Sequence, residues 1–547
     1  MATSGRDTKS PLEPNSALSN PASLLFHPMS VDQQRKDNLA CSDKVNHADL
    51  DAKPIPETRI EAPETIKQAL TRHPWTIVWL VYGIWMVACN SFDSSAGSTV
   101  LGIPKFRQDY GFMYNSNYVL PAKWQSAYSG GPAAAQVIGT FMGGGLGDKI
   151  GRKWMTLVTY LILFIGITLE VVSHQTSNPN AVFFAGKFVN GFAIGALMTT
   201  AMTYIVEIAP VRLRGIFAAA AGISFCVGTL VLSLIVNAYG QLDTEWAYKS
   251  AFVTQYGVTG IALFIWPFMP ESPTWLISVN KDTQAIKALK RLGQSEAEIE
   301  VSLATIKYTL EKAREESSGV TYAELFRKTN LRRTIIASMP LIIQQFSGVN
   351  WIAGYFTYYA QLAGYSTAMS YKLSITQQVL SMVGNINSWF LIESFGRRGL
   401  SLWGLIGLTV VLFIAGGTAC LETIAGNRAT VSLILIYCWG YNMTIGATAY
   451  VAMSEIGTSR LRTKTAAFSL AMQGAWGTMW SFTLPYLFNP NEANLGAKCA
   501  FIFGALSIIC CVYFYYYHPE TKGRSLAELD EMFAQRVPAR KFATYQF

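Results

Sequence analysis

The sequence predicts an all-α membrane protein with about twelve transmembrane helices, arranged as two parallel-repeat six-helix bundles with helices in a cytosolic linker. Three observations lead to this fold class: long apolar stretches, Lys and Arg confined to alternate connections, and motifs that recur in the second half. The chain has 547 residues, of which 51% are hydrophobic and 14% are charged. A soluble domain carries about 25% charged residues, so we expect lipid to solvate most of this chain.

The apolar stretches are of two kinds, and a spanning helix needs about 20 mostly apolar residues. The nearly continuous stretches are Trp154–Val172, Ile216–Val236, Ala251–Phe268, Leu400–Thr418, Val431–Val451 and Cys499–Tyr516. Those interrupted by glycine and polar residues are Thr76–Cys89, Gln136–Gly147, Val182–Tyr204, Ile335–Ala360, Leu373–Ile392 and Thr465–Leu487. Together they predict about twelve spans.

Positive charge marks one set of connections. Lys and Arg follow the second, fourth, eighth and tenth spans, at Lys149, Arg152, Lys153, Arg212, Arg214, Arg397, Arg398, Arg460, Arg462 and Lys464. The long connection 271–333 is also rich in them, whereas 173–180 and 361–371 contain neither. Short cytosolic loops carry an excess of Lys and Arg, so we expect both termini and the long connection in the cytosol. This topology accounts for the net charge of +9 without a nucleic acid partner.

Three short motifs recur in the same order in the second half of the chain. They are Gly151–Lys153 with Gly396–Arg398, Glu207–Arg214 with Glu455–Arg462, and Pro270–Ser272 with Pro519–Thr521. Their offsets are nearly constant (396 − 151, 455 − 207 and 519 − 270). Three ordered matches indicate two homologous halves, and because each motif returns on the same side, the repeats are parallel.

The predicted organisation has five parts. They are a disordered cytosolic tail (1–72), a first bundle (73–270), a helical cytosolic linker (271–332), a second bundle (333–518) and a cytosolic tail (519–547). The first tail is polar and has no apolar core, so we expect disorder and no cleavable signal. In the linker, Ser295 and Glu298 have the spacing of a capping box, which predicts the start of a helix.

Few residues are of the kinds that enzymes or metal sites use. The chain has five His and eight Cys, and it lacks the HExxH, GxSxG and phosphate-loop patterns. The cysteines show neither metal spacing nor a disulfide pattern, so we interpret them as small buried residues. We therefore expect no enzymatic activity, no catalytic residue, no metal and no bound cofactor.

Six segments resemble the signatures of the sugar porter family of the major facilitator superfamily. They are GGGLGDKIGRK (143–153), EIAPVRLRG (207–215), PESPTWL (270–276), QQFSGVN (344–350), ESFGRR (393–398) and PETKGRSLAELDEMF (519–533). Four further segments resemble the fungal α-glucoside (maltose) permease branch of that family. These are WAYKSAFVTQY (246–256), SWFLIESFGRR (388–398), SEIGTSRLRTKT (454–465) and NLGAKCAFIFG (494–504).

The resemblance implies the major facilitator fold, a sugar site between the bundles near mid-membrane, and alternating access. It also implies a proton-coupled symporter of a small sugar, such as the α-glucoside maltose, in the plasma membrane; we expect a monomer. Two alternatives stay open: a monosaccharide or polyol transporter, as symporter or uniporter, and a sugar sensor that does not transport. Sensors of this type usually add a long cytosolic extension, whereas only residues 519–547 follow the last span here.

Asp93 lies in the first span, where a carboxylate is costly unless it faces a cavity or a partner. Proton-coupled relatives keep an acid on this span and an Arg on the fourth, and Lys187 stands at the position of that Arg. The resemblance therefore implies that Asp93 carries the coupling proton and that Lys187 is its partner, although Lys lacks the fork of Arg. Two simpler interpretations stay open: Asp93 caps a helix end, or Lys187 extends its charge to the membrane surface.

Side-chain amides suit a sugar site because they both donate and accept hydrogen bonds, as hydroxyl groups require. The seventh span carries Gln344, Gln345 and Asn350, and three amides in lipid indicate a polar cavity. The resemblance adds Gln473 on the eleventh span, where relatives carry Asn, and Tyr450 on the tenth, where many carry Trp. The amides can instead join helices to each other, and Tyr450 can belong to the core.

Two positions depart from the hexose porters. Gly222 stands where a Gln is expected on the fifth span, and Ser381 stands where an Asn is expected on the eighth. The loss of two large amides widens the predicted site, which fits a bulkier substrate or simply a different one.

The repeated motifs also combine acids with arginines at the cytosolic ends of the spans. Acids contribute little to membrane orientation, so topology alone does not explain them. In relatives such residues form an ion-pair latch, and the resemblance implies a cytosolic gate that is shut in the outward-open state. Its predicted members are Asp148, Arg152, Glu207, Arg214, Glu393, Arg397, Glu455 and Arg462.

Overall fold

The computed structural model describes residues 71–115, 117–317, 321–458, 461–524 and 526–545. The predicted disordered tail lies outside these residues, except for its last two. The described residues belong to one compact unit, and their regular structure is helical apart from one short hairpin. The all-α fold class is therefore confirmed, and the hairpin is an addition that the sequence did not predict.

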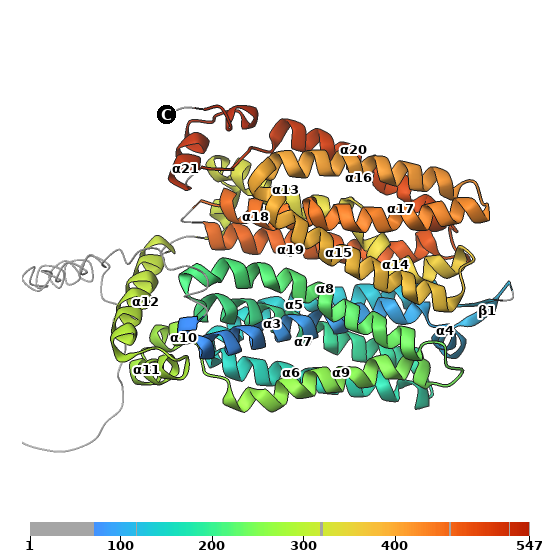
Figure 1. Cartoon of the computed structure of the whole chain (residues 1–547), viewed down its shortest axis with the longest axis horizontal. Coiled ribbons are helices and arrows are strands. Elements are labelled where there is room, and N and C mark those ends of the chain that lie inside the picture. The colour runs from blue at the N-terminus through green and yellow to red at the C-terminus, as the bar shows by residue number, and fades with distance from the viewer. Residues whose placement is uncertain (1–70, 116, 318–320, 459–460, 525, 546–547) are drawn as a thin grey trace, which may run out of the picture. The chain divides into compact units, whose positions relative to one another are not determined.

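The helices form two bundles that lie side by side in Figure 1. The first bundle, in blue to green, contains α3 (Pro74–Thr99), α5 (Ala122–Ile150), α6 (Arg152–Val172), α7 (Pro179–Ile208), α8 (Val211–Tyr239) and α9 (Trp246–Ile265). The second bundle, in yellow to red, contains α13 (Lys328–Phe346), α14 (Val349–Leu362), α15 (Thr367–Phe395), α16 (Arg397–Ala419), α17 (Ile424–Met443), α18 (Ile445–Ile456), α19 (Arg462–Phe488) and α20 (Cys499–Tyr517).

Eight segments of the described residues are long and apolar enough to cross a membrane by themselves. The remaining spans are α5, α15, α19 and the pair α17 and α18. Helix α5 packs against α19, and α15 packs against α8, so these helices meet partners across the two bundles. Such contacts favour small and polar residues; a Cβ atom at Gly130, for example, would lie 2.6 Å from the ring of Phe482. This explains why hydropathy alone misses α5, α15 and α19.

The two ends of the bundles differ. Helix α4 (Pro104–Tyr110) and the antiparallel strands β1 (Phe112–Tyr114) and β2 (Asn117–Val119) project from one end, which we call the hairpin end (Figure 1). Gly151, between α5 and α6, and Gly396, between α15 and α16, lie at the opposite end, which we call the motif end. The motif end carries the Lys and Arg that predict the cytosolic side.

Hydrogen bonds join the two bundles at the hairpin end. They include Ser126 Oγ to Phe482 O (2.8 Å), Gln125 Nε2 to Asn489 Oδ1 (2.8 Å) and Tyr371 Oη to Gly240 O (3.1 Å). In the described part of the chain, every hydrogen bond between the bundles lies in this half of the molecule, and none lies at the motif end. The hydrogen bonds between the bundles therefore tie them at the hairpin end.

Two spans of the second bundle are broken. Helix α13 ends at Phe346 and α14 begins at Val349, and Gly348 between them has a φ of 98°. A side chain is strained at this φ, and its Cβ atom would also lie 3.1 Å from Phe503 Cβ. The second break, at Thr444, separates α17 from α18. Irregular backbone in a membrane is tolerated where protein groups satisfy it or a cavity borders it, so both breaks point to the interior of this bundle.

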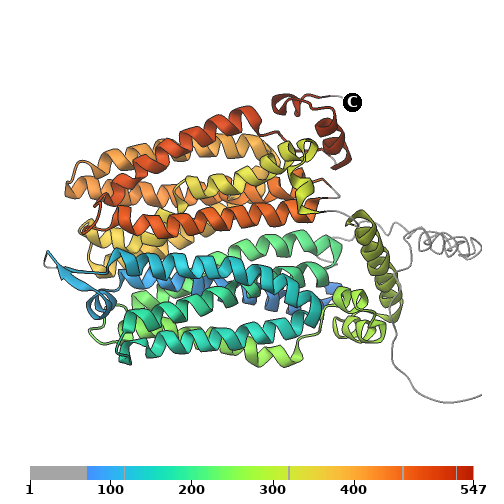
Figure 2. The same cartoon turned by 180° about the vertical axis from the view of Figure 1, so that it is seen from behind.

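The linker helices α10 (Pro273–Ser278), α11 (Asp282–Arg291) and α12 (Glu296–Ser317) lie at the motif end of the first bundle, as both Figure 1 and Figure 2 show. Three hydrogen bonds tie them there: Trp275 Nε1 to Asp148 O (2.8 Å), Thr76 Oγ1 to Leu292 O (2.8 Å) and Arg72 Nε to Glu298 Oε1 (2.7 Å). The predicted capping box also forms, since Ser295 N donates to Glu298 Oε2 at 2.9 Å.

The segment before α13 and the C-terminal segment pack on the second bundle instead. In the short helix η4 (Tyr322–Phe326), the ring of Phe326 lies 5.4 Å from that of Phe468. In the C-terminal helix α21 (Leu526–Ala534), Asp530 forms an ion pair with Arg333 of α13. At the motif end, the linker helices therefore pack on the first bundle, and η4 and α21 pack on the second.

Candidate functional site

Four helices of the first bundle bring five buried polar side chains together. Lys187 Nζ of α7 lies 3.1 Å from Asp93 Oδ1 of α3 and 3.0 Å from Glu170 Oε1 of α6. Gln255 Nε2 of α9 donates to Asp93 Oδ1 at 3.1 Å, and Asn190 Nδ2 of α7 donates to Glu170 Oε1 at 2.6 Å. We call these five residues the charged cluster. The side chains of Asp93, Glu170 and Lys187 are 6%, 0% and 3% exposed, so their charges are balanced by one another rather than by solvent.

The local sequence explains how α6 and α7 approach closely enough to share the charged cluster. Lys187 and Asn190 are three residues apart, which places them on one face of α7. Glycine provides the space: a Cβ atom at Gly166 would lie 2.0 Å from Asn190 Oδ1, and one at Gly186 would lie 2.9 Å from Glu170 Cγ. A larger residue at either glycine would push the two helices apart.

The structure places the predicted pair Asp93 and Lys187 in direct contact, with Lys187 buried rather than extended to the membrane surface. Glu170 was not among the predicted site residues. It lies near the end of the apolar stretch Trp154–Val172, in no motif, and its distance from Lys187 along the chain gives no hint of contact. The sequence offered one general signal for Glu170: an ionisable residue inside a membrane span needs a partner.

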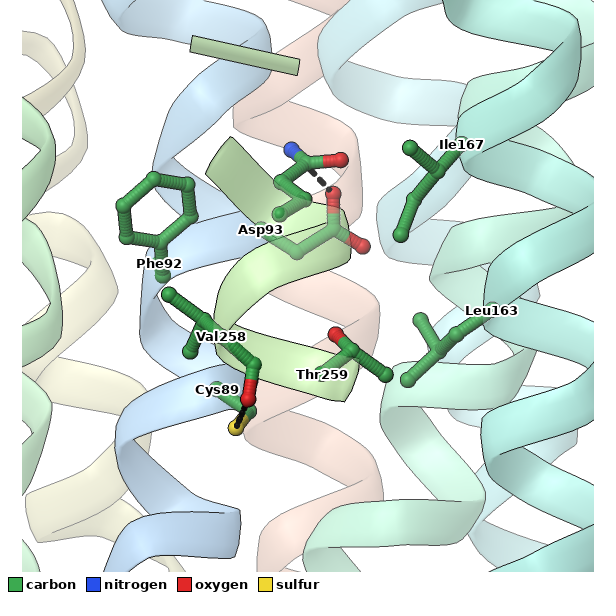
Figure 3. A pocket seen from close by; sticks show the side chains of 8 residues that line it. Cys89, Phe92, Asp93, Leu163, Ile167, Val258 and Thr259 are labelled. Atoms are coloured by element: carbon green, nitrogen blue, oxygen red, sulfur yellow. Dashed lines mark hydrogen bonds between the residues drawn. The ribbon is translucent and has the colours of Figure 1, made fainter. Parts of the chain in front are cut away.

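A small pocket adjoins Asp93 inside the first bundle (Figure 3). Its wall is mostly apolar, with Phe92, Leu163 and Ile167 around the carboxylate, and Thr259 adds a hydroxyl. One carboxylate oxygen of Asp93 bonds to Gln255 and Lys187, whereas Oδ2 has no hydrogen-bond partner among the described residues. An unpaired carboxylate oxygen in an apolar wall is costly.

In the second bundle, the five predicted sugar-binding residues form two hydrogen-bonded groups. Asn350 Nδ2 donates to Gln345 Oε1 at 2.8 Å across the break between α13 and α14. Gln473 Nε2 of α19 donates to Gln344 Oε1 at 2.7 Å and to Tyr450 Oη of α18 at 3.2 Å. The predicted residues therefore come together at the broken spans.

Gln344 differs from the other four because protein groups occupy both ends of its amide. Its Nε2 donates to Ile445 O and Gly446 O at 3.0 Å each, in the first turn of α18 after the break at Thr444. Its Oε1 accepts from Gln473. Gln344 is 2% exposed, whereas Tyr450 is 46% exposed. Gln344 thus joins helices, as the alternative interpretation held, and leaves Gln345, Asn350, Gln473 and Tyr450 better placed for a ligand.

The two positions that depart from hexose porters lie between the bundles or near them. A Cβ atom at Gly222 of α8 would lie 3.5 Å from the Nδ2 atom of Asn385 of α15. Asn385 was not predicted as a site residue, and it stands one helical turn after the buried Ser381. The eighth span therefore still presents an amide toward the first bundle, at a position displaced by one turn.

At the motif end, the acids and arginines pair within each bundle. Arg152 bonds Glu207 through Nε (3.0 Å) and Nη2 (2.8 Å), and it bonds Asp148 at 3.0 Å. In the second bundle, Arg397 bonds Glu455 through Nε (3.1 Å) and Nη2 (2.9 Å), and it bonds Glu393 at 3.3 Å. Arg462 is exposed and has no ion pair with a described residue, and the side chain of Arg214 lies outside the described residues.

Two further acids complete the motif-end arrangement, and they were not among the predicted gate residues. Glu271 Oε1 accepts from the backbone N–H of Arg152 at 2.8 Å, and Glu520 Oε1 accepts from that of Arg397 at 2.8 Å. Each acid thus caps the first turn of a spanning helix, α6 or α16. Burial raises the pKa of Glu271 above its ordinary value, and the backbone hydrogen bonds partly offset this shift. Their place in the repeated Pro-Glu motif was the signal in the sequence that could have identified them.

At the hairpin end, Arg107 of α4 crosses to the second bundle. Its Nη2 atom donates to Gln361 Oε1 at 2.8 Å, and its guanidinium lies 5.1 Å from the centre of the Tyr358 ring. Gln361 Nε2 in turn donates to Gly102 O at 2.6 Å. These residues belong to no recurring motif, so the sequence did not reveal them. Together they close the hairpin end.

The chain matches the family described as "Sugar (and other) transporter" over residues 85–533. A general alpha-glucoside permease of Saccharomyces cerevisiae is 27% identical over 501 residues, which cover 88% of this chain and 79% of the permease. Maltose permease MAL31 of the same yeast is 28% identical over 526 residues, covering 92% of this chain and 83% of the permease. The predicted relation to sugar porters and to fungal α-glucoside permeases is therefore confirmed.

Solved structures support the same fold. The inward-open xylose transporter XylE of E. coli superposes with a TM-score of 0.69 at 19% identity, covering 84% of this chain and 99% of XylE. The nucleoside transporter NupG, of the same architecture, gives a TM-score of 0.54 at 14% identity, covering 81% of this chain and 99% of NupG. With two helical bundles, apolar spans and a family match over most of its length, this chain is an integral membrane protein and belongs to the sugar transporters of the major facilitator superfamily, which are transporters rather than enzymes.

Proposed function

We propose that this protein is a sugar:proton symporter that imports a small sugar by alternating access, and that the sugar is an α-glucoside such as maltose. The buried contact between Asp93 and Lys187 is the observation that carries the proposal, because ionisable residues buried within a membrane span are costly and mark ion and substrate pathways. The yeast relatives named as alpha-glucoside and maltose permeases support the substrate class.

The sugar site lies at the broken spans of the second bundle and faces the first bundle. Gln345, Asn350 and Gln473 supply amides for sugar hydroxyls, and Tyr450 supplies an aromatic face for the ring. Gln344 contributes by fixing Gln473 and α18. Gly222 leaves room beside Asn385, which favours a substrate larger than a hexose.

The proton provides the energy for accumulation. A proton that enters down about 100 mV supplies about 2.3 kcal/mol, and about one pH unit adds about 1.4 kcal/mol. At about 1.4 kcal/mol per tenfold change, their combination supports accumulation of a few hundredfold. Asp93 takes up this proton, and Lys187 stabilises Asp93 when the proton is absent.

The acids and arginines of the motif end form the cytosolic gate, with Asp148, Arg152, Glu207 and Arg214 in one bundle and Glu393, Arg397, Glu455 and Arg462 in the other. Because the described hydrogen bonds between the bundles lie at the hairpin end, we assign the structure to a state that opens toward the motif end. We place the motif end and both termini in the cytosol and the protein, as a monomer, in the plasma membrane. An epitope tag at residue 300 should resist external protease, and one within 173–180 should be cleaved; the reverse result overturns this orientation.

Uptake into liposomes that contain the purified protein tests the function. We expect maltose to accumulate when the proton gradient is inward, and an uncoupler to abolish accumulation; glucose, cellobiose, glycerol and quinate serve as competitors and as alternative substrates. Accumulation of glucose or glycerol but not maltose would favour a monosaccharide or polyol transporter. Equilibration that an uncoupler does not affect would indicate a uniporter, and maltose binding without uptake would indicate a sensor.

A further inference from the structure

The charged cluster contains one more acid than a simple proton-binding pair. Lys187 lies within 3.1 Å of both Asp93 and Glu170, so the bonded oxygens of the two acids are no more than about 6 Å apart. Both carboxyl groups are buried, and each has a second oxygen without a hydrogen-bond partner among the described residues. Any account of proton binding at Asp93 must therefore include Glu170.

Counting charges shows what the second acid does. With both acids ionised, the charged cluster carries a net charge of −1 in a buried setting, which is costly. One bound proton makes it neutral: one acid is protonated, and the other pairs with Lys187. In a cluster of Asp93 and Lys187 alone, the neutral state has no bound proton, and protonation of Asp93 leaves an unpaired buried ammonium.

We propose that Glu170 is a positioning residue of coupling, which retains Lys187 when Asp93 is protonated and thereby sets the pH range in which Asp93 exchanges its proton. This inference rests on the proposed proton coupling. The proton binds a carboxylate oxygen of Asp93, Lys187 keeps its charge throughout, and its hydrogen bond to Glu170 persists while that to Asp93 is lost. Both proton-bound and proton-free states then keep a partner for the buried ammonium.

The groups that face Glu170 are few. The charged ones are Lys187 of α7 and Asp93 of α3. Helix α7 adds the neutral amide of Asn190, α9 adds Gln255 beyond Asp93, and α4 adds the phenol of Tyr110, which bonds Ser173 one turn after Glu170. Of the described histidines, His518 is remote from the cluster, and burial lowers its pKa to about 3, so it does not titrate in the range of uptake assays. His174, near Lys249 at the hairpin end, requires a control.

The test is the pH profile of maltose uptake by wild type, Glu170→Gln and Glu170→Asp in liposomes. Glu170→Gln keeps the shape of the side chain but leaves Asp93 as the only partner of Lys187. We expect its half-maximal uptake to move toward acid by about one pH unit or more, with counterflow of sugar retained at low pH. Glu170→Asp should restore most of the wild-type profile. His174→Gln and Glu245→Gln, at the hairpin end, serve as controls that should not move it.

Lys187→Gln provides a second measurement with the opposite sign. Without the ammonium group, the two acids hold the proton more firmly, so sugar uptake by Lys187→Gln should persist to higher pH. Release of the proton should slow, and net accumulation of sugar should slow with it. If Glu170→Gln folds and shows the wild-type profile, or if both variants move the profile in the same direction, Glu170 is only a structural counter-ion and the inference fails. If wild-type uptake itself ignores pH and uncouplers, the proposed symport fails instead.

Discussion

The two bundles share a framework at the motif end and differ in what they bury at their centres. Arg152 bonds Glu207, and Arg397 bonds Glu455, each through two guanidinium nitrogens. Deeper inside, the first bundle buries two acids and a lysine, whereas the second buries neutral amides such as Gln345. The repeated halves have therefore kept one structure at the motif end and diverged at their centres.

The difference has a physical meaning. A buried ion cluster changes its energy by several kcal/mol when one proton binds, whereas neutral amides bind hydroxyl groups equally well over a wide pH range. Under the proposed function, the first bundle responds to protons and the second recognises sugar. Substitutions in one bundle should then affect one property and leave the other intact.

The largest effect is expected for Asp93→Asn, which separates the two properties. The neutral amide mimics the protonated acid and leaves Glu170 to pair with Lys187, so accumulation and sugar-induced proton influx should be lost while sugar exchange continues. Radiolabelled uptake and counterflow measure the two. Asp243→Asn, in an exposed loop of the first bundle, should behave as wild type. If Asp93→Asn still accumulates sugar in an uncoupler-sensitive way, the coupling acid lies elsewhere, and the division of roles between the two bundles is contradicted.

In the second bundle, Gln345→Ala and Asn350→Ala should weaken sugar binding without changing the pH profile. Each removes a hydroxyl partner worth roughly 1–3 kcal/mol, which corresponds to an increase of roughly 5- to 150-fold in the apparent KM. Protein levels in the membrane should stay normal, with Gln535→Ala in the C-terminal segment as the control. Normal affinity in both variants would place the sugar away from this bundle.

Charge reversal at the motif end should affect the two bundles alike, because the framework is shared. Arg152→Glu and Arg397→Glu should each favour the state open at the motif end. To avoid local effects, the cysteine reporter belongs on the other bundle: Ser454→Cys for Arg152→Glu, and Thr203→Cys for Arg397→Glu. Labelling of both reporters should accelerate several-fold. Unchanged rates would mean that these arginines only set the topology.

The smallest effect is expected at the hairpin end, where Gln361→Ala removes two hydrogen bonds among several. Loss of its bonds to Arg107 and Gly102 O should cost about 1 kcal/mol and loosen the closed end. A cysteine at Ser233, which is buried opposite Ser374 of the other bundle, reports on this opening. We expect Gln361→Ala to accelerate labelling of this cysteine a few-fold. A labelling rate equal to that of the reporter variant without Gln361→Ala would show that the remaining contacts hold this end shut.

The sequence predicted most of the fold because its signals are local or repeated. Apolar length, charge placement and three recurring motifs led to two parallel bundles, and the pair of Asp93 with Lys187 followed from the family resemblance. Contacts between single residues on different helices could not be predicted. Glu170 reaches Lys187 only because Gly166 and Gly186 let α6 and α7 approach, and that spacing becomes visible only in three dimensions.

Gln344 illustrates a second limit. An amide on a predicted spanning helix can bind a ligand or satisfy backbone freed by a break in a neighbouring helix, and the sequence does not distinguish the two. The break at Thr444 has no proline or glycine at its centre. Without that break in view, nothing separated Gln344 from Gln345, although their surroundings differ.

The contacts of the linker determine which bundle each of its parts follows. Helices α10, α11 and α12 are bonded to the first bundle through Trp275, Leu292 and Glu298, whereas η4 packs on the second through Phe326. When the bundles rock, we therefore expect α10, α11 and α12 to move with the first bundle and η4 to move with the second.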